Sequence, residues 1–150
     1  METLSLRQRD DLLRFLHGEA WELLGGPFAL THFDLAHNHI YLTRENGAWQ
    51  VAGFIDCAEA MRGPAEWDVV YLWFWTFSGD REAMQQCLCA LYADTPPPAR
   101  FARRCFAAAL YTPSMGLLWR HFLQRGGDGE SVVRTMTAFF FPEELFGPPG

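Results

Sequence analysis

A short apolar hairpin bounded by two aspartates constrains this chain more than any other feature. Asn46-Gly47 separates two runs rich in β-prone residues, 40–43 and 49–55. Both residues of an Asn-Gly pair tolerate positive φ, so the pair predicts a two-residue hairpin turn. Asp34 lies on the loop before this hairpin, and Asp56 directly follows its second strand. Because a hairpin brings its ends together, we expect the two carboxylates to face one cavity, within about 10 Å of each other, as a shared cation requires.

Helices are predicted on both sides of the hairpin. Residues 5–24 form an amphipathic pattern that Ser5 can cap and that Gly25-Gly26-Pro27 ends. Its apolar stripe should face the core and consists of Leu6, Leu12, Leu13, Leu16, Ala20, Leu23 and Leu24. Pro64 opens a second helix, and its run 67–77 is apolar almost all round, which predicts burial. Asp68 near the start of that helix should therefore be largely buried and hydrogen-bonded.

The rest of the chain is expected to be helical. Further helices are predicted at 80–92, starting at Ser78 or Gly79, and at 99–111, 114–124 and 131–141. We expect one domain, 1–150, with a core motif region at 28–78, a helical remainder at 79–141 and a tail at 142–150. A short buried strand or extended run is expected at 28–31. The predicted fold class is mainly α with a small β-hairpin (α+β).

Composition excludes several classes of protein. Hydrophobic residues make up 49% of the chain and aromatic residues 15%, which supports an ordered core. The net charge of −6, without a basic run, argues against a nucleic-acid partner. No apolar run reaches membrane-spanning length, and residues 1–11 lack the core of a signal peptide. The four scattered cysteines are interpreted as reduced thiols of a cytoplasmic protein.

The order and spacing of these residues resemble the aminoglycoside phosphotransferase and choline kinase family, which has a protein-kinase-like fold. That family shows His-x-Asp, an Asn five residues after the Asp, a hairpin, Ile-Asp, and later an Asp that opens a helix. The matching residues in this chain are His32, Asp34, His39, Ile55-Asp56 and Asp68. The resemblance covers about the first half of the chain. His39 stands where the family has Asn, and Asn38 is one position early; some antibiotic-kinase branches also carry His there.

The resemblance implies ATP- or GTP-dependent phosphorylation of a hydroxyl on a small molecule, with Mg²⁺ as the metal. It implies that Asp34 is the catalytic base and that Asp56 binds the metal together with His39 or, alternatively, Asn38. It also implies that Asp68 supports the loop 32–34 by holding its backbone. His32 is expected to be structural, buried and hydrogen-bonded behind this loop, and His37 has no assigned role.

The amino-terminal nucleotide lobe of the family is not matched. No Gly-rich loop, strand lysine or partner glutamate precedes the motif, and every basic residue of the chain is arginine. An arginine from the later helices would then have to meet the phosphates. We therefore expect a kinase-like carboxy-terminal lobe with little or no phosphotransfer of its own. The face that would meet the other lobe could take a partner chain or self-associate.

Two other functions stay open at this point. Asp34 alone is more simply an Asx-turn residue, and Asp56 alone could cap the segment 57–61, so a non-catalytic remnant or binding lobe is one alternative. The second is a metallohydrolase, because His32, Asp34, His37 and His39 are all possible zinc ligands. Against the second, alternate residues of a strand point in opposite directions, and no matching cluster follows downstream.

Overall fold

The structure is a computed structural model that describes residues 4–112, 116, 120 and 131–147. Most of the helix predicted at 114–124 therefore lies outside the described residues. Within the described part, no helix combines the length and the apolar character needed to cross a membrane.

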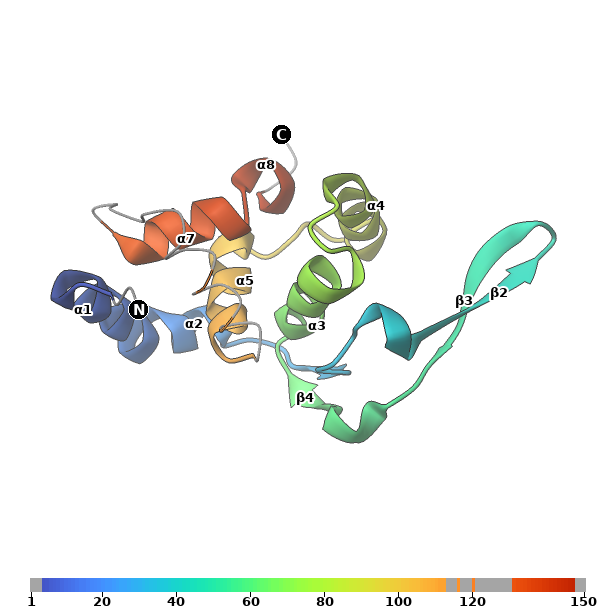
Figure 1. Ribbon diagram of the computed structural model, residues 1–150, viewed down its shortest axis with the longest axis horizontal. Helices are drawn as coiled ribbons and strands as arrows, with labels where there is room; N and C mark the ends of the chain where they lie inside the picture. The colour runs from blue at the N-terminus through green and yellow to red at the C-terminus, as the bar shows by residue number, and fades with distance from the viewer. Residues whose placement is uncertain (1–3, 113–115, 117–119, 121–130, 148–150) are drawn as a thin grey trace.

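Helices form the body of the molecule, and a β-hairpin extends away from it (Figure 1). This arrangement confirms the predicted mainly α fold with a small hairpin. The helices are α1 (Leu6–Arg14), α2 (Ala20–Leu24), α3 (Glu66–Tyr71), α4 (Arg81–Leu91), α5 (Phe101–Leu110), α7 (Val132–Phe140) and α8 (Glu143–Phe146). Two antiparallel pairs of strands accompany them: β1 (Ala29–Thr31) with β4 (Met61–Gly63), and β2 (Ile40–Glu45) with β3 (Ala48–Phe54).

The first helical segment begins as predicted but does not present the predicted stripe. Ser5 caps α1 with a capping box formed with Gln8. A π-helical turn, Phe15–Glu19, then separates α1 from α2. Because this turn holds one extra residue, Phe15 and Ala20 lie on the same buried side although they are five positions apart. Of the predicted stripe, Leu6 and Leu13 are exposed instead, so that part of the prediction is wrong.

Helix α5 lies at the centre of the helical body. Eight of its residues are buried, including a run of three alanines at 107–109 whose small side chains let α2 and α3 approach closely. The thiol of Cys105 is fully buried here, and this burial raises its pKa, so the thiol stays neutral. Burial around most of its circumference explains why α5 contacts several other helices.

The carboxyl-terminal segment is not the predicted tail. Residues 143–146 form α8, and the ring of Phe146 is fully buried. Its centroid lies 5.6 Å from that of Trp73 and 5.3 Å from that of Phe141. A four-residue helix is too short to show a periodic pattern in the sequence, and only its packing against these aromatic rings holds it in place.

Two other boundaries differ from the prediction. Helix α4 is capped by Asp80 itself, which accepts hydrogen bonds from the amides of Glu82 and Ala83, and not by Ser78 or Gly79. After Asp56, a 3₁₀ turn leads into β4, which the sequence did not predict. Strand β4 pairs with β1, so the residues flanking the motif region are joined.

The β1–β4 pair is short, and β1 is not buried as predicted, because only Thr31 of its three residues faces the core. The hydroxyl of Thr31 donates a hydrogen bond of 2.9 Å to the carbonyl of Met61. Opposite Ala29 lies Gly63, and a Cβ at that glycine would come within 2.0 Å of the Trp67 ring. Glycine is therefore needed at this position because the indole of α3 packs directly on the backbone of β4.

Ion pairs tie α5 to the elements around it. Nε of Arg104 lies 2.5 Å from Oε1 of Glu66, and the Glu66 side chain is almost fully buried. Arg100 and Arg103 both pair with Glu19 of the π-helical turn. These contacts join α5 to the helix that carries Asp68 and to the first helical segment.

Removing one member of the buried pair should destabilise the fold strongly. Arg104→Ala leaves the Glu66 carboxylate buried without its partner, and we expect it to cost about 3–5 kcal/mol of unfolding free energy. Urea denaturation measures this loss. The matched control is Arg81→Ala, which removes a solvent-exposed pair of 3.9 Å with Glu144 and should cost about 0–1 kcal/mol. Equal losses of unfolding free energy in the two variants would show that the Arg104–Glu66 pair matters no more to stability than an exposed pair.

Candidate active site

The loop that carries Asp34 is held by the carboxylate of Asp68. The amide of His32 donates to Oδ2 of Asp68 at 3.0 Å, and the amide of Phe33 donates to Oδ1 at 2.9 Å. These are the predicted hydrogen bonds to the loop. Asp68 is half-buried and not largely buried as expected, because it lies in the first turn of α3 at the edge of the helical body.

Further contacts anchor the loop to the π-helical turn Leu72–Thr76 that continues α3. The hydroxyl of Thr76 donates to the carbonyl of Leu35 at 2.7 Å. Nδ1 of His37 donates to the carbonyl of Trp75 at 3.0 Å, so His37 anchors the loop, a role that the sequence did not indicate. The loop is therefore fixed both before and after Asp34.

The far end of the hairpin is bonded to the same loop. Nε2 of His32 donates to the carbonyl of Ile55 at 2.8 Å, and the amide of Ile55 donates to the carbonyl of His39 at 3.0 Å. His32 is half-buried and not buried as predicted, and it links the loop to the residue that follows β3. As a result, Asp56 is carried to the position beside Asp34.

Two residues of the site adopt left-handed backbone conformations. Phe33 has φ of 63° and Asp56 has φ of 58°. A non-glycine residue in this region costs on the order of 1–2 kcal/mol, which neighbouring contacts must offset. Asp68 provides such contacts for Phe33. Asp56 occupies the first position of a 3₁₀ turn, but its side chain makes no capping hydrogen bond, so capping does not account for it.

Asp34, His39 and Asp56 form a cluster with metal-ligand spacing. One ligand atom from each lies within 4.8 Å of the other two. Nδ1 of His39 lies 2.8 Å from the carbonyl oxygen of Asp34, so this nitrogen carries the proton and donates it. In the neutral ring, Nε2 is the nitrogen with the lone pair, and it lies 3.7 Å from Oδ2 of Asp56. This is the tautomer in which a histidine can bind a cation.

A pocket of about 550 Å³ opens beside this cluster. Its lining residues come from the Asp34 loop, from the 3₁₀ turns His37–His39 and Cys57–Glu59, and from α3 with its π-helical turn. They are Phe33, Asp34, Ala36, Asn38, His39, Glu59, Tyr71 and Trp75. Asn38 is exposed and also lines this pocket. Of the two predicted alternatives, His39 has one ring nitrogen 3.4 Å from Oδ2 of Asp34 and the other 3.7 Å from Oδ2 of Asp56.

Tyr71 and Glu59 are pocket residues that the sequence analysis missed. Burial raises the pKa of the Tyr71 hydroxyl, and the negative charges of Asp34, Glu59 and Asp68 raise it further. The hydroxyl therefore stays protonated and can donate a hydrogen bond near these carboxylates. One signal could have found it, because Tyr71 follows Asp68 by three positions and so shares its face of the helix.

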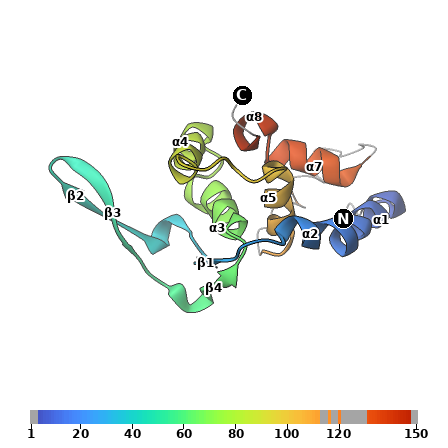
Figure 2. The same cartoon turned by 180° about the vertical axis from the view of Figure 1, so that it is seen from behind.

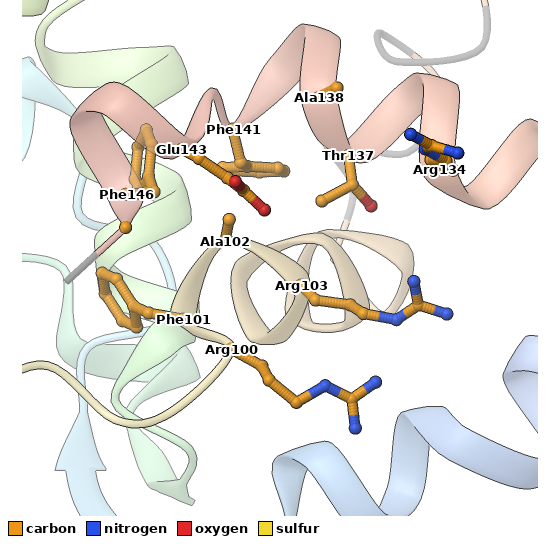
Figure 3. A pocket seen from close by; sticks show the side chains of 11 residues that line it. Arg100, Phe101, Ala102, Arg103, Arg134, Thr137, Ala138, Phe141, Glu143 and Phe146 are labelled. Carbon is orange, nitrogen blue, oxygen red and sulfur yellow. The ribbon is translucent and has the colours of Figure 1, made fainter.

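Four arginines in the later part of the chain that the structure describes are engaged elsewhere. Those that pair with carboxylates outside the Asp34 pocket are Arg81, Arg100, Arg103 and Arg104. Figure 3 shows Arg100 and Arg103 on α5 and Arg134 on α7, around a second pocket of about 490 Å³. Glu143 of α8 also lines this second pocket. Among the described residues, those lining the Asp34 pocket include no arginine that could replace a lysine.

Loss of the Asp68 carboxylate should loosen the loop. Asp68→Ala leaves the His32 and Phe33 amides without acceptors, and we expect a cost of roughly 1–3 kcal/mol in unfolding free energy. Asp68→Asn keeps one acceptor oxygen and should lose less. Urea denaturation of the three proteins measures both values, and an Asp68→Ala variant as stable as the parent chain would show that these hydrogen bonds contribute nothing.

Comparison with known protein families identifies a match for this chain. The model of the phosphotransferase enzyme family matches residues 1–102, a range that includes Asp34, His39, Asp56 and Asp68. No curated protein and no solved structure gives a match. Since the family model covers more than half of the 150 residues, the chain belongs to the phosphotransferase enzyme family.

Proposed function

We propose that this chain is a kinase-like carboxy-terminal lobe that holds a small-molecule hydroxyl and a divalent cation for phosphoryl transfer from ATP or GTP. The observation that carries the proposal is the Asp34, His39 and Asp56 cluster, whose ligand atoms lie within 4.8 Å of one another beside a pocket. The four free cysteines fit a reducing, cytoplasmic setting for this function.

Asp34 is the proposed base. Its side chain is 36% exposed and lines the pocket, so a bound hydroxyl can reach it. The carboxylate accepts the proton of the substrate hydroxyl as the alcohol oxygen forms its bond to the γ-phosphorus and the bond to the departing diphosphate breaks. Because Asp34 lies on a loop fixed at both ends, it orients that oxygen as well as accepting its proton.

His39 and Asp56 are the residues that would hold the cation. The Asp56 carboxylate and an imidazole nitrogen of His39, with the Asp34 carboxylate beside them, form a donor set that fits a divalent ion such as Mg²⁺ or Mn²⁺. When bound, the cation would neutralise charge on the phosphates. The hydrogen bond from Nδ1 to the Asp34 carbonyl keeps Nε2 of His39 available for this role.

The zinc-hydrolase alternative fits the structure less well. His32 and His37 each donate a ring N–H to a backbone carbonyl and are not members of the cluster. Only His39, of the three histidines around Asp34, remains as a ligand there. Because the cluster offers the carboxylate oxygens of two aspartates and only one histidine, it suits magnesium better than zinc.

Metal binding tests the cluster directly. We expect Mn²⁺ to bind residues 1–150 and to lose at least about tenfold in affinity in Asp56→Asn and in His39→Ala, because each removes one ligand. Electron paramagnetic resonance of free Mn²⁺ measures the affinity. His17→Ala, which removes an exposed histidine of the π-helical turn Phe15–Glu19, is the matched control and should bind Mn²⁺ as the parent chain does. A His39→Ala variant with unchanged affinity would remove His39 from the site.

Nucleotide binding and turnover test the function. We expect residues 1–150 to bind a fluorescent ATP analogue only with Mn²⁺ or Mg²⁺ present, and Asp56→Asn to abolish this binding. With Mg²⁺-ATP and a panel of aminoglycosides, macrolides and amino alcohols, turnover should stay far below the ordinary kinase range of about 1–100 s⁻¹, since 1–150 includes no lysine to meet the phosphates.

Each other outcome has a distinct meaning. Ordinary turnover that Asp34→Asn abolishes would establish phosphoryl transfer and overturn the expectation of low activity. Failure to bind either the metal or the nucleotide would overturn the proposed function and leave a non-catalytic remnant of the family fold.

A further inference from the structure

The β2–β3 hairpin has little of the helical body to pack against. Figures 1 and 2 show it from opposite sides, and in both views it extends away from the helices. Its two strands contact mainly each other. An isolated two-stranded hairpin is at best marginally stable in water, so this one gains stability if another surface covers it.

The two faces of the hairpin differ in chemistry. Side chains alternate between faces along a strand, and paired residues share a face. The pairs Ile40–Phe54, Leu42–Val51 and Arg44–Trp49 therefore lie on one side, here called the apolar hairpin face. A register shift between Tyr41 and Leu42 keeps Phe54 on this side. The opposite side carries more polar residues: Tyr41, Thr43, Glu45, Ala48, Gln50 and Gly53.

The exposed apolar area of this face is close to what a dimer interface needs. Leu42, Trp49, Val51 and Phe54 are between 52% and 68% exposed. Since a large apolar side chain presents roughly 150–250 Å² in full, these four together present on the order of 500 Å². A standard interface of about 800 Å² per partner, a little over half of it non-polar, requires about 450 Å² of apolar surface.

Charge along the hairpin favours one orientation of a second copy. Arg44 lies at the tip with its guanidinium over the Trp49 ring at 5.8 Å. Asp56 and Glu59 are exposed at the base. In an antiparallel arrangement, Arg44 of one copy approaches the acidic base of the other, whereas a parallel arrangement would bring the two arginines together.

We propose that two copies of this chain associate through the apolar hairpin face, packed face to face and antiparallel in a symmetric dimer. Packing of the two ribbons buries Leu42, Trp49, Val51 and Phe54 of each copy between them. The same packing pairs the tip of each hairpin with the base of the other. This dimer does not depend on the proposed phosphotransfer, and its test uses no nucleotide.

The oligomeric state of residues 1–150 tests this dimer. Sedimentation equilibrium at about 1 to 100 µM covers the range expected for an interface of this size. We expect the mass to approach twice 17.2 kDa as concentration rises. Val51→Asp places a charge on the apolar hairpin face and should give a monomer. Gln50→Asp is the matched control, because it places the same charge one position along the same strand on the opposite face and should leave the dimer intact.

A second variant distinguishes loss of the dimer from unfolding of the hairpin. Arg44→Glu keeps every apolar side chain of the face but puts like charges together, and should weaken dimerisation at least about tenfold. Circular dichroism confirms that each variant is folded. A parent chain that stays monomeric throughout, or a Gln50→Asp variant that dissociates as completely as Val51→Asp, would overturn the proposal.

Discussion

The hydrogen bonds from the His32 and Phe33 amides to Asp68 are the contacts on which the candidate site depends. Phe33 is held in a left-handed conformation directly before Asp34, and this strained backbone needs acceptors on the adjacent helix. Both oxygens of Asp68 are used, so the carboxylate sets the direction of the loop as well as its position. The placement of Asp34 follows from a residue 34 positions away in the chain.

Helix α3, which carries Asp68, is itself held in place by a second carboxylate, that of Glu66. Glu66 and Asp68 lie in the same first turn of α3, but Glu66 pairs with Arg104 of the central α5 while Asp68 faces the loop. One turn of helix therefore connects the core to the candidate site. A change in the α3–α5 contact should reach the site through this turn, because α3 has no independent stability at six residues.

The sequence predicted those parts of the fold that local chemistry decides. Asn46-Gly47 adopts the positive φ values that its hairpin turn requires, and Ser5 caps its helix as expected. The predicted apolar stripe was partly wrong because a π-helical turn shifts the buried positions. The predicted tail was wrong because Phe146 of α8 packs against the distant rings of Trp73 and Phe101. Neither event leaves a local signal, since both depend on packing partners far along the chain.

In the candidate site, too, the sequence predicted some features and tertiary packing decided the others. The sequence by itself determined that Asp34 and Asp56 lie together, because a tight hairpin between them leaves their loops little choice. Only the tertiary structure decided that Nε2 of His39 faces Asp56, through the bond from Nδ1 to a backbone carbonyl. It also decided that the Tyr71 hydroxyl lies near these carboxylates. Such orientations depend on how α3 packs against the loop, and a linear pattern of residue types does not encode that packing angle.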